Sequence, residues 1–212
     1  MVYSENILIC IAVPLVIAIL FTAKGTRSFL FSFVMGMVTC LISAYISGFL
    51  RFVMNVETEE MAVFYSPLIE EALKLLPLLF YMFVFIPDSS KLYTAALGIG
   101  LGFATFENCC YILSSTSPGL GYVLIRGMAV GIMHLVCALF LAIGLDMAKR
   151  LRGVMVPGLF GALTLSAGFH GLYNLLVSEP GIPAIIGYLL PILNVAVLYY
   201  PYEKKIRNGL VY

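Results

Sequence analysis

Residues 66–80 read SPLIEEALKLLPLLF, so two glutamates and a lysine lie in a segment that is otherwise apolar enough for lipid. A charge at the centre of a bilayer costs about 2.5–3.5 kcal/mol even on the mildest insertion scale. Glu70, Glu71 and Lys74 are therefore expected to face the inside of a helical bundle. Lys74 follows the two acids by four and three positions, so a helix would place it beside both of them.

The whole chain has the composition of a protein embedded in a membrane. Of its 212 residues, 62% are hydrophobic and 11% are charged, whereas a soluble domain is about half apolar and a quarter charged. We therefore predict an all-α, polytopic protein of the cell membrane, surrounded by membrane lipid. The net charge of +1 gives no electrostatic basis for binding nucleic acid, so nucleic acid is excluded as a partner.

Seven stretches are long and apolar enough to cross a bilayer, which takes about 20 residues per helix. They are residues 6–23, 28–50, 61–86, 92–116, 120–145, 154–177 and 181–200. No linker between them is long enough to separate domains, so we expect a single transmembrane bundle over residues 1–212. The first stretch lacks a basic leader and a small-residue cleavage site, which favours a retained span over a signal peptide.

The basic residues predict how this bundle is oriented. Nine of them fall at one set of span ends, whereas Arg51 alone falls at the opposite set, together with the acidic run 57–60. Since lysine and arginine accumulate in cytoplasmic loops, we expect the N-terminus outside and the C-terminus in the cytoplasm. The nine are Lys24, Arg27, Lys91, Lys149, Arg150, Arg152, Lys204, Lys205 and Arg207.

The ionisable residues inside the spans fall at similar depths. They are Glu70, Glu71, Lys74, Glu107, Arg126, His134 and His170. With about 1.5 Å of rise per residue, the acids and histidines on four of the helices reach one layer roughly 10–20 Å below the outer surface. We therefore predict that the four helices within residues 61–178 form a core that carries a polar site.

The residue types in this layer are suited to hydrolysis. Two adjacent carboxylates in a low-dielectric setting do not both ionise readily, and Lys74 can compensate only one of them. The other acid can then collect a proton from water and return it later, as a general base does. A zinc site of the His/His/Glu type fits equally well, so the residues alone leave both mechanisms open. The candidate metal ligands are Glu71, Glu107, His134 and His170.

Four motifs have the order and spacing of a known family. They are EExxK (70–74), GFATFENxxY (102–111), an arginine eight residues before a histidine (126 and 134) and HGxYN (170–174). Over residues 60–180 the chain resembles the PrsW intramembrane proteases. That family is similar to the CAAX prenyl endopeptidases and to the APH subunit of gamma-secretase, which is not itself a protease.

The resemblance implies an intramembrane endopeptidase that cuts a single-span, membrane-anchored protein, such as an anti-sigma factor, near the extracytoplasmic side. Carried over residue by residue, it implies Glu70 and Glu71 as the catalytic acid pair. It likewise implies His134 and His170 as the functional histidines and Asn174 as the asparagine of the last motif.

Three further residues are expected to support the site: Lys74, Glu107 and Arg126. Glu107 stands where the CAAX endopeptidases have a histidine, and Lys74 stands one position before their arginine, which argues against a prenyl-cysteine substrate. The family classification implies a metalloprotease, whereas the CAAX relatives imply a glutamate-activated water without metal. The identity of the cofactor, zinc or none, therefore stays open.

Two other functions remain open at this point. The polar cluster could serve only to hold helices together in a non-catalytic scaffold or assembly subunit, as in the APH relative, because interhelical hydrogen bonds explain many polar residues in membranes. Buried acids and histidines also form proton relays in transporters. A proton-coupled transporter is less favoured, because the chain shows no paired inverted repeats.

Overall fold

The computed structural model describes residues 4–21, 24–114, 119–151, 153 and 155–207, and these fold into helices. The helices are α1 (Ser4–Phe21), α2 (Lys24–Met54), α3 (Thr58–Glu60), the π-helix η1 (Met61–Tyr65), α4 (Ser66–Phe85), α5 (Ser89–Ser114), α6 (Leu120–Arg150), α7 (Met155–Ser178) and α8 (Ile182–Arg207). The all-α prediction is confirmed. Arg152 and the predicted span residues 22–23, 115–116 and 154 lie outside the described residues.

Four helices in the described part of the chain are long and apolar enough to cross a membrane. They are Gly25–Met54, Ser89–Ser114, Leu120–Arg150 and Met155–Ser178, and shorter apolar stretches occur at Ile7–Ile19 and Ile182–Ala196. Helix α4 is 20 residues long, but its apolar composition is interrupted by the three charged residues of the acidic motif. The protein is therefore a membrane protein with several spanning helices, as predicted.

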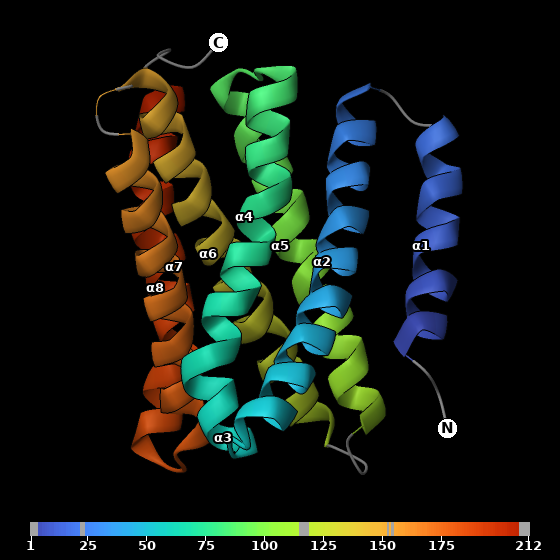
Figure 1. Cartoon of the computed structure of the whole chain (residues 1–212). Helices are drawn as coiled ribbons and strands as arrows, with labels where there is room; N and C mark the ends of the chain where they lie inside the picture. The colour runs from blue at the N-terminus through green and yellow to red at the C-terminus, as the bar shows by residue number, and fades with distance from the viewer. Residues whose placement is uncertain (1–3, 22–23, 115–118, 152, 154, 208–212) are drawn as a thin grey trace.

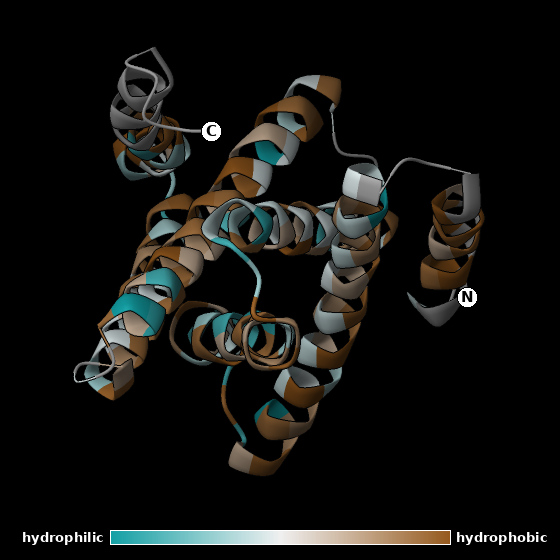
Figure 2. Cartoon of the chain, turned by 90° about the horizontal axis from the view of Figure 1, so that it is seen from above, coloured by the Kyte–Doolittle hydropathy of each residue, from teal (hydrophilic) through white to brown (hydrophobic). Residues whose placement is uncertain are grey.

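The long helices run side by side, and the two terminal ones lie at opposite edges (Figure 1). Helix α1 packs against α2 and, to a lesser extent, α5, whereas α8 packs against α7 and α6. In the view from above, much of the helical ribbon consists of hydrophobic residues, with hydrophilic ones among them (Figure 2). This arrangement leaves α4, α5, α6 and α7 between the edge helices, where polar side chains can be shielded from lipid.

The tightest helix pair is held together by glycine. A Cβ atom on Gly36 of α2 would overlap the carbonyl oxygen of Ile99 in α5, and one on Gly102 of α5 would overlap the carbonyl oxygen of Phe33 in α2. The two backbones therefore touch directly, as small residues allow in membrane helices. This contact places α5, which carries Glu107, against the middle of the bundle.

A proline explains the irregular start of α4. The N–H of Ser66 bonds to the carbonyl of Met61, which is the π-helical pattern. In that pattern the next donor would be residue 67, but Pro67 has no N–H to offer the carbonyl of Ala62. Asn174 of α7 supplies the donor instead, with its Nδ2 2.8 Å from the Ala62 oxygen. Helix α7 is thereby tied to the segment that leads into the acidic motif.

Apolar side chains pack on two sides of the polar residues. One cluster joins α4, α5 and α6 near the α4–α5 connection, and its members include Leu78, Leu92 and Leu141, which are at most 1% exposed. A second cluster joins α6 to α7 and includes Met133 and Tyr173. The polar site described next therefore lies in a largely dry interior.

Candidate active site

Lys74 of α4 is fully buried and lies between an acid and a histidine. Its Nζ is 2.6 Å from Oε1 of Glu71 and 2.6 Å from Nδ1 of His134. The ammonium group also lies 4.1 Å from the ring centre of Phe103. A buried charge is tolerated only when it is paired and hydrogen-bonded, and Lys74 meets this condition through contacts to three helices. The predicted pairing of Lys74 with the acidic motif is confirmed.

Glu71 receives hydrogen bonds from two helices. Its Oε1 accepts from Lys74, and the same oxygen lies 2.9 Å from Nδ1 of His170 on α7. Its Oε2 accepts from the buried hydroxyl of Ser166, at 2.9 Å. Because an ionised carboxylate binds such donors strongly, Glu71 acts as an anchor that fixes the orientation of the His170 ring.

Glu70 differs from Glu71 because one of its carboxylate oxygens is unpaired. Its Oε2 is buried and has no hydrogen-bond partner in the described part of the chain. This oxygen lies 3.8 Å from Nε2 of His170. In the neutral form of His170 that donates from Nδ1 to Glu71, Nε2 carries a lone pair, and two acceptors then face each other. Such a gap is suited to a ligand that brings protons or positive charge.

His134 of α6 connects this gap to an outer ion pair. Its Nδ1 accepts from Lys74, and its Nε2 lies 2.5 Å from Oε2 of Glu107 on α5, to which it donates. The other Glu107 oxygen lies 3.2 Å from NH2 of Arg126. Polar contacts therefore run without a break from Arg126 through Glu107, His134 and Lys74 to Glu71.

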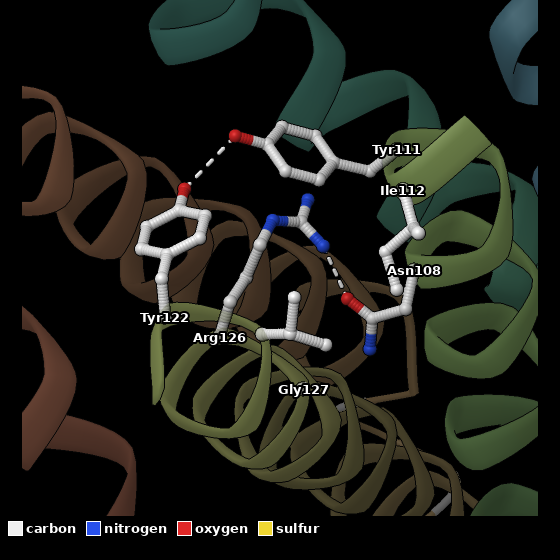
Figure 3. Close-up of a pocket in the computed structure, with 7 residues that line it drawn as sticks. Asn108, Tyr111, Ile112, Tyr122, Arg126 and Gly127 are labelled. Carbon is white, nitrogen blue, oxygen red and sulfur yellow. Dashed lines mark hydrogen bonds between the residues drawn. The ribbon is translucent and has the colours of Figure 1, made fainter. Parts of the chain in front are cut away.

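Arg126 is turned toward the protein. Figure 3 shows its side chain beside Asn108 and Tyr111, in a pocket between α5 and α6. NH1 donates to Oδ1 of Asn108, and the guanidinium lies 3.6 Å from the ring centre of Tyr111. The Tyr111 hydroxyl is in turn 2.9 Å from that of Tyr122. These contacts hold the cation that faces Glu107.

With all three carboxylates ionised and both histidines neutral, the formal charges of the connected side chains sum to one negative charge. Three carboxylates, those of Glu70, Glu71 and Glu107, face two permanent cations, Lys74 and Arg126, while the histidines are counted as neutral. Three negative charges minus two positive charges leave −1. A low-dielectric interior favours neutrality, so the cluster has room for one more positive charge, which a proton or a bound cation can supply.

The structure brings six of the predicted residues into one connected cluster: Glu70, Glu71, Lys74, Glu107, His134 and His170. Arg126 joins it through Glu107, as a supporting residue. Asn174 is not bonded to His170; its amide holds Ala62, although its side chain lines the same cavity as Glu107.

Sequence reasoning missed two buried residues of the cluster, Ser166 and Cys137. Ser166 precedes His170 by four positions, so helical spacing alone could have marked it. Cys137 follows His134 by three positions, and its Sγ lies 3.6 Å from the Ser166 carbonyl oxygen. Both are short polar residues in an apolar helix, which is a weak signal because such residues commonly bond to their own backbone.

Fold and site together define a multi-pass helical membrane protein with a buried acid–histidine centre. The chain belongs to the PrsW family of intramembrane metalloproteases, which it matches over residues 24–200. Neither the curated proteins nor the solved structures contain a match to it. The protein is therefore a peptidase that works within the membrane.

The donor atoms around Glu70 fit the metal that this family implies. Glu70, His134 and His170 each offer one ligand atom, and these atoms lie within 4.8 Å of one another. The unpaired Oε2 of Glu70 and the free Nε2 of His170 are available at once. Glu71 supports His170 from its other nitrogen, as outer carboxylates do for metal-bound histidines.

His134 would need to release one partner before it could join a metal. Both of its nitrogens are engaged, one by Lys74 and the other by Glu107. Of the predicted ligands, Glu71 and Glu107 both bond to histidine nitrogens in this structure, whereas Glu70 provides the unpaired oxygen. A second set of possible ligand atoms comes from Glu71, Cys137 and His170.

Proposed function

We propose that this chain is an endopeptidase that hydrolyses a peptide bond in a single-span, membrane-anchored protein, such as an anti-sigma factor, near the extracytoplasmic side. The observation that carries the proposal is the buried, unpartnered Oε2 of Glu70, 3.8 Å from Nε2 of His170. A water molecule between these two acceptors can donate a proton to either of them. Hydrolysis of an amide needs such a positioned base.

Some residues of the cluster transfer protons, and others hold these residues in position. Glu70 takes a proton from the attacking water. With a proton from solvent on Nε2, the His170 ring, held by Glu71 2.9 Å from Nδ1, donates a hydrogen bond to the oxyanion, and Glu70 then returns its proton to the leaving amine as the C–N bond breaks. Lys74 and Ser166 keep Glu71 in place. Glu107, held by Arg126, fixes the ring of His134.

A bound metal ion would have specific ligands in this site. Glu70, His134 and His170 are the residues that would hold a zinc ion, and the ion would polarise the scissile carbonyl and lower the cost of forming hydroxide from water. The net charge of −1 on the cluster favours uptake of a cation. Asn174, which the resemblance implies as a catalytic residue, serves in this proposal to position α7, because its amide is bound to Ala62.

We further propose a topology that agrees with an extracytoplasmic cut. The seven long helices each cross the membrane, with the N-terminus outside and the C-terminus in the cytoplasm. Residues 1–212 form one bundle, and residues 61–178 form the four-helix core that carries the site. The asymmetry of nine basic residues against one supports this orientation, which places the cluster in the outer half of the bilayer.

A scaffold or assembly subunit is the second candidate. The ion pair between Glu71 and Lys74 is fully buried, and such a pair can serve only to specify helix packing. The scaffold reading does not explain Glu70, because a purely structural role gives no reason to bury an unpaired carboxylate oxygen. A proton-coupled transporter has no specific contact in its favour.

The test uses purified protein in lipid vesicles with candidate single-span substrates, incubated with and without a metal chelator. We expect a substrate to be cut at one position, as shown by mass spectrometry of both fragments. Loss of cleavage with the chelator, and its return with zinc, would assign a metal mechanism, whereas unchanged cleavage would assign the carboxylate alone. If no candidate substrate is cut under any of these conditions, the scaffold reading gains over the peptidase.

A further inference from the structure

A cavity of about 110 Å³ lies beside the acid–histidine cluster, among α5, α6, α7 and α8. We call it the tyrosine chamber. Its lining residues include Glu107, Val130, Met133, Tyr173, Val177 and Tyr188.

The tyrosine chamber adjoins the reacting groups through Glu107. This side chain is 32% exposed, whereas its partner His134 is fully buried. Glu107 bonds to Nε2 of His134, and His134 lies with Glu70 and His170 in the set of possible ligands. A group that enters the chamber therefore contacts Glu107, which is bonded to one histidine of that set.

One wall of the tyrosine chamber is apolar, and its lining also includes Glu107 and Arg126, which are already paired with each other. Met133, Val130 and Tyr173 are at most 4% exposed and belong to one apolar cluster. A charged group would lose its hydration there and would find both ionic side chains already engaged with each other, so an uncharged side chain is the better occupant. The volume sets a limit on size, because it is smaller than that of an apolar cavity of about 150 Å³ that binds benzene. A short aliphatic side chain fits the chamber, and an aromatic one does not.

Tyr188 closes the tyrosine chamber from the edge helix α8. It packs against the apolar cluster of α6 and α7. Gly187 explains how α8 comes so near, because a Cβ atom at this position would lie 2.8 Å from Cγ1 of Val177 and 2.9 Å from Cβ of Leu176. Tyr188 is thus a large side chain that an adjacent glycine brings over the cavity.

We propose that the tyrosine chamber is a subsite for a substrate side chain beside the scissile bond, and that Tyr188 sets the largest side chain it accepts. This inference rests on the proposed peptidase function. Tyr188 has no bond to the acid–histidine cluster, so shortening it enlarges the chamber while it leaves the proton-transferring groups in place.

The test compares substrates in which each residue flanking the cut is changed in turn to Ala, Val, Leu or Phe. We expect Tyr188→Ala to raise kcat/KM for the Phe substrate, relative to the Ala substrate, about tenfold, since a change of pocket size by a few methylene groups is worth at least that much. Tyr188→Phe keeps the ring and should leave the ratio unchanged. Tyr45→Ala, at an exposed tyrosine of α2, is the control for loss of any tyrosine.

Val177→Ala enlarges the chamber from α7 instead. Its Phe-to-Ala ratio is measured where Tyr188→Ala does not fold or does not cut. An unchanged Phe-to-Ala ratio in both variants, with normal cleavage by the unaltered protein, would overturn the subsite and leave the peptidase function intact. Absence of cleavage by the unaltered protein would overturn both.

Discussion

At the scale of single residues, burial of the Lys74 charge carries a large desolvation penalty, and the partners of this charge are well defined. It is fully buried, and its ammonium contacts Glu71 and His134 at 2.6 Å. Removal of one partner from a buried ion pair leaves an uncompensated charge, which costs more than the pair itself contributes. The Lys74–Glu71 pair is therefore expected to behave as a unit.

We predict that Lys74→Met lowers the free energy of unfolding by about 3–5 kcal/mol, because Glu71 is left charged without its lysine. The double variant Lys74→Met/Glu71→Gln removes both charges and should recover much of that loss. Thermal and denaturant unfolding in detergent micelles would measure both. A double variant no more stable than Lys74→Met alone would show that the pair is not the source of the cost.

At the scale of helices, the link between α7 and the start of α4 depends on one amide. Asn174 donates to the Ala62 carbonyl because Pro67 cannot. This link ties α7, which carries His170, to the segment that leads into Glu70. Asn174 thus has a structural reason to be present, apart from any contact with substrate.

We predict that Asn174→Ala costs about 0.5–1.5 kcal/mol, the usual net contribution of one hydrogen bond, because the Ala62 carbonyl is exposed. In a Pro67→Ala background the new N–H of residue 67 can reach Ala62, so the same change should cost much less. A double-mutant cycle by thermal unfolding measures the difference. Equal costs in both backgrounds would contradict the link, and loss of cleavage in the stable double variant would instead support an oxyanion role for Asn174.

The glycines of α2 provide a second test at this scale. Gly36 has the carbonyl of Ile99 against it, whereas Gly48 on the same helix has nothing within 4 Å of the Cβ position. We predict that Gly36→Ala destabilises the protein by about 1–3 kcal/mol through overpacking. Gly48→Ala should be neutral or slightly stabilising, because alanine favours helix. Similar melting temperatures for the two variants would show that α2 and α5 are not in direct backbone contact.

At the scale of the whole molecule, the orientation in the bilayer decides which side of the membrane the site serves. We predict that an N-terminal epitope tag is digested by protease added to sealed cells, and that a C-terminal tag is digested only after the membrane is opened. The nine-to-one distribution of basic residues is the physical reason. The same accessibility for both tags would require an even number of spans and would remove the argument for an extracytoplasmic cut.

Much of the fold could be predicted from the sequence, because apolar length alone marks helices that span a bilayer. The breaks between helices agree with the predicted ones to within a few residues. The contact of Lys74 with Glu71 follows from helical spacing. The meeting of His134 and His170, with ring centres 4.9 Å apart, agrees with the prediction that both lie in one layer of the bundle.

The finer structure of the site could not be predicted. Helical spacing allowed Lys74 to pair with either acid, and only packing against Phe103 and His134 selects Glu71. The hydrogen bond from Asn174 to Ala62 requires the π-helix. Pro67 favours a π-helix, but a proline in the sequence does not by itself predict one. Depth places Glu107 near His134, but only the three-dimensional arrangement shows a cavity beside them.

The measurement that tests the central claim most directly compares Glu70→Gln with the unaltered protein in cleavage of a single-span substrate in vesicles. Glu59→Gln, at an exposed position of α3, is the matched control. We predict that Glu70→Gln remains folded, with an unchanged melting temperature, but cuts no substrate, while Glu59→Gln cuts normally. Cleavage by folded Glu70→Gln at the rate of the unaltered protein would contradict the claim that this acid–histidine cluster is the site of hydrolysis.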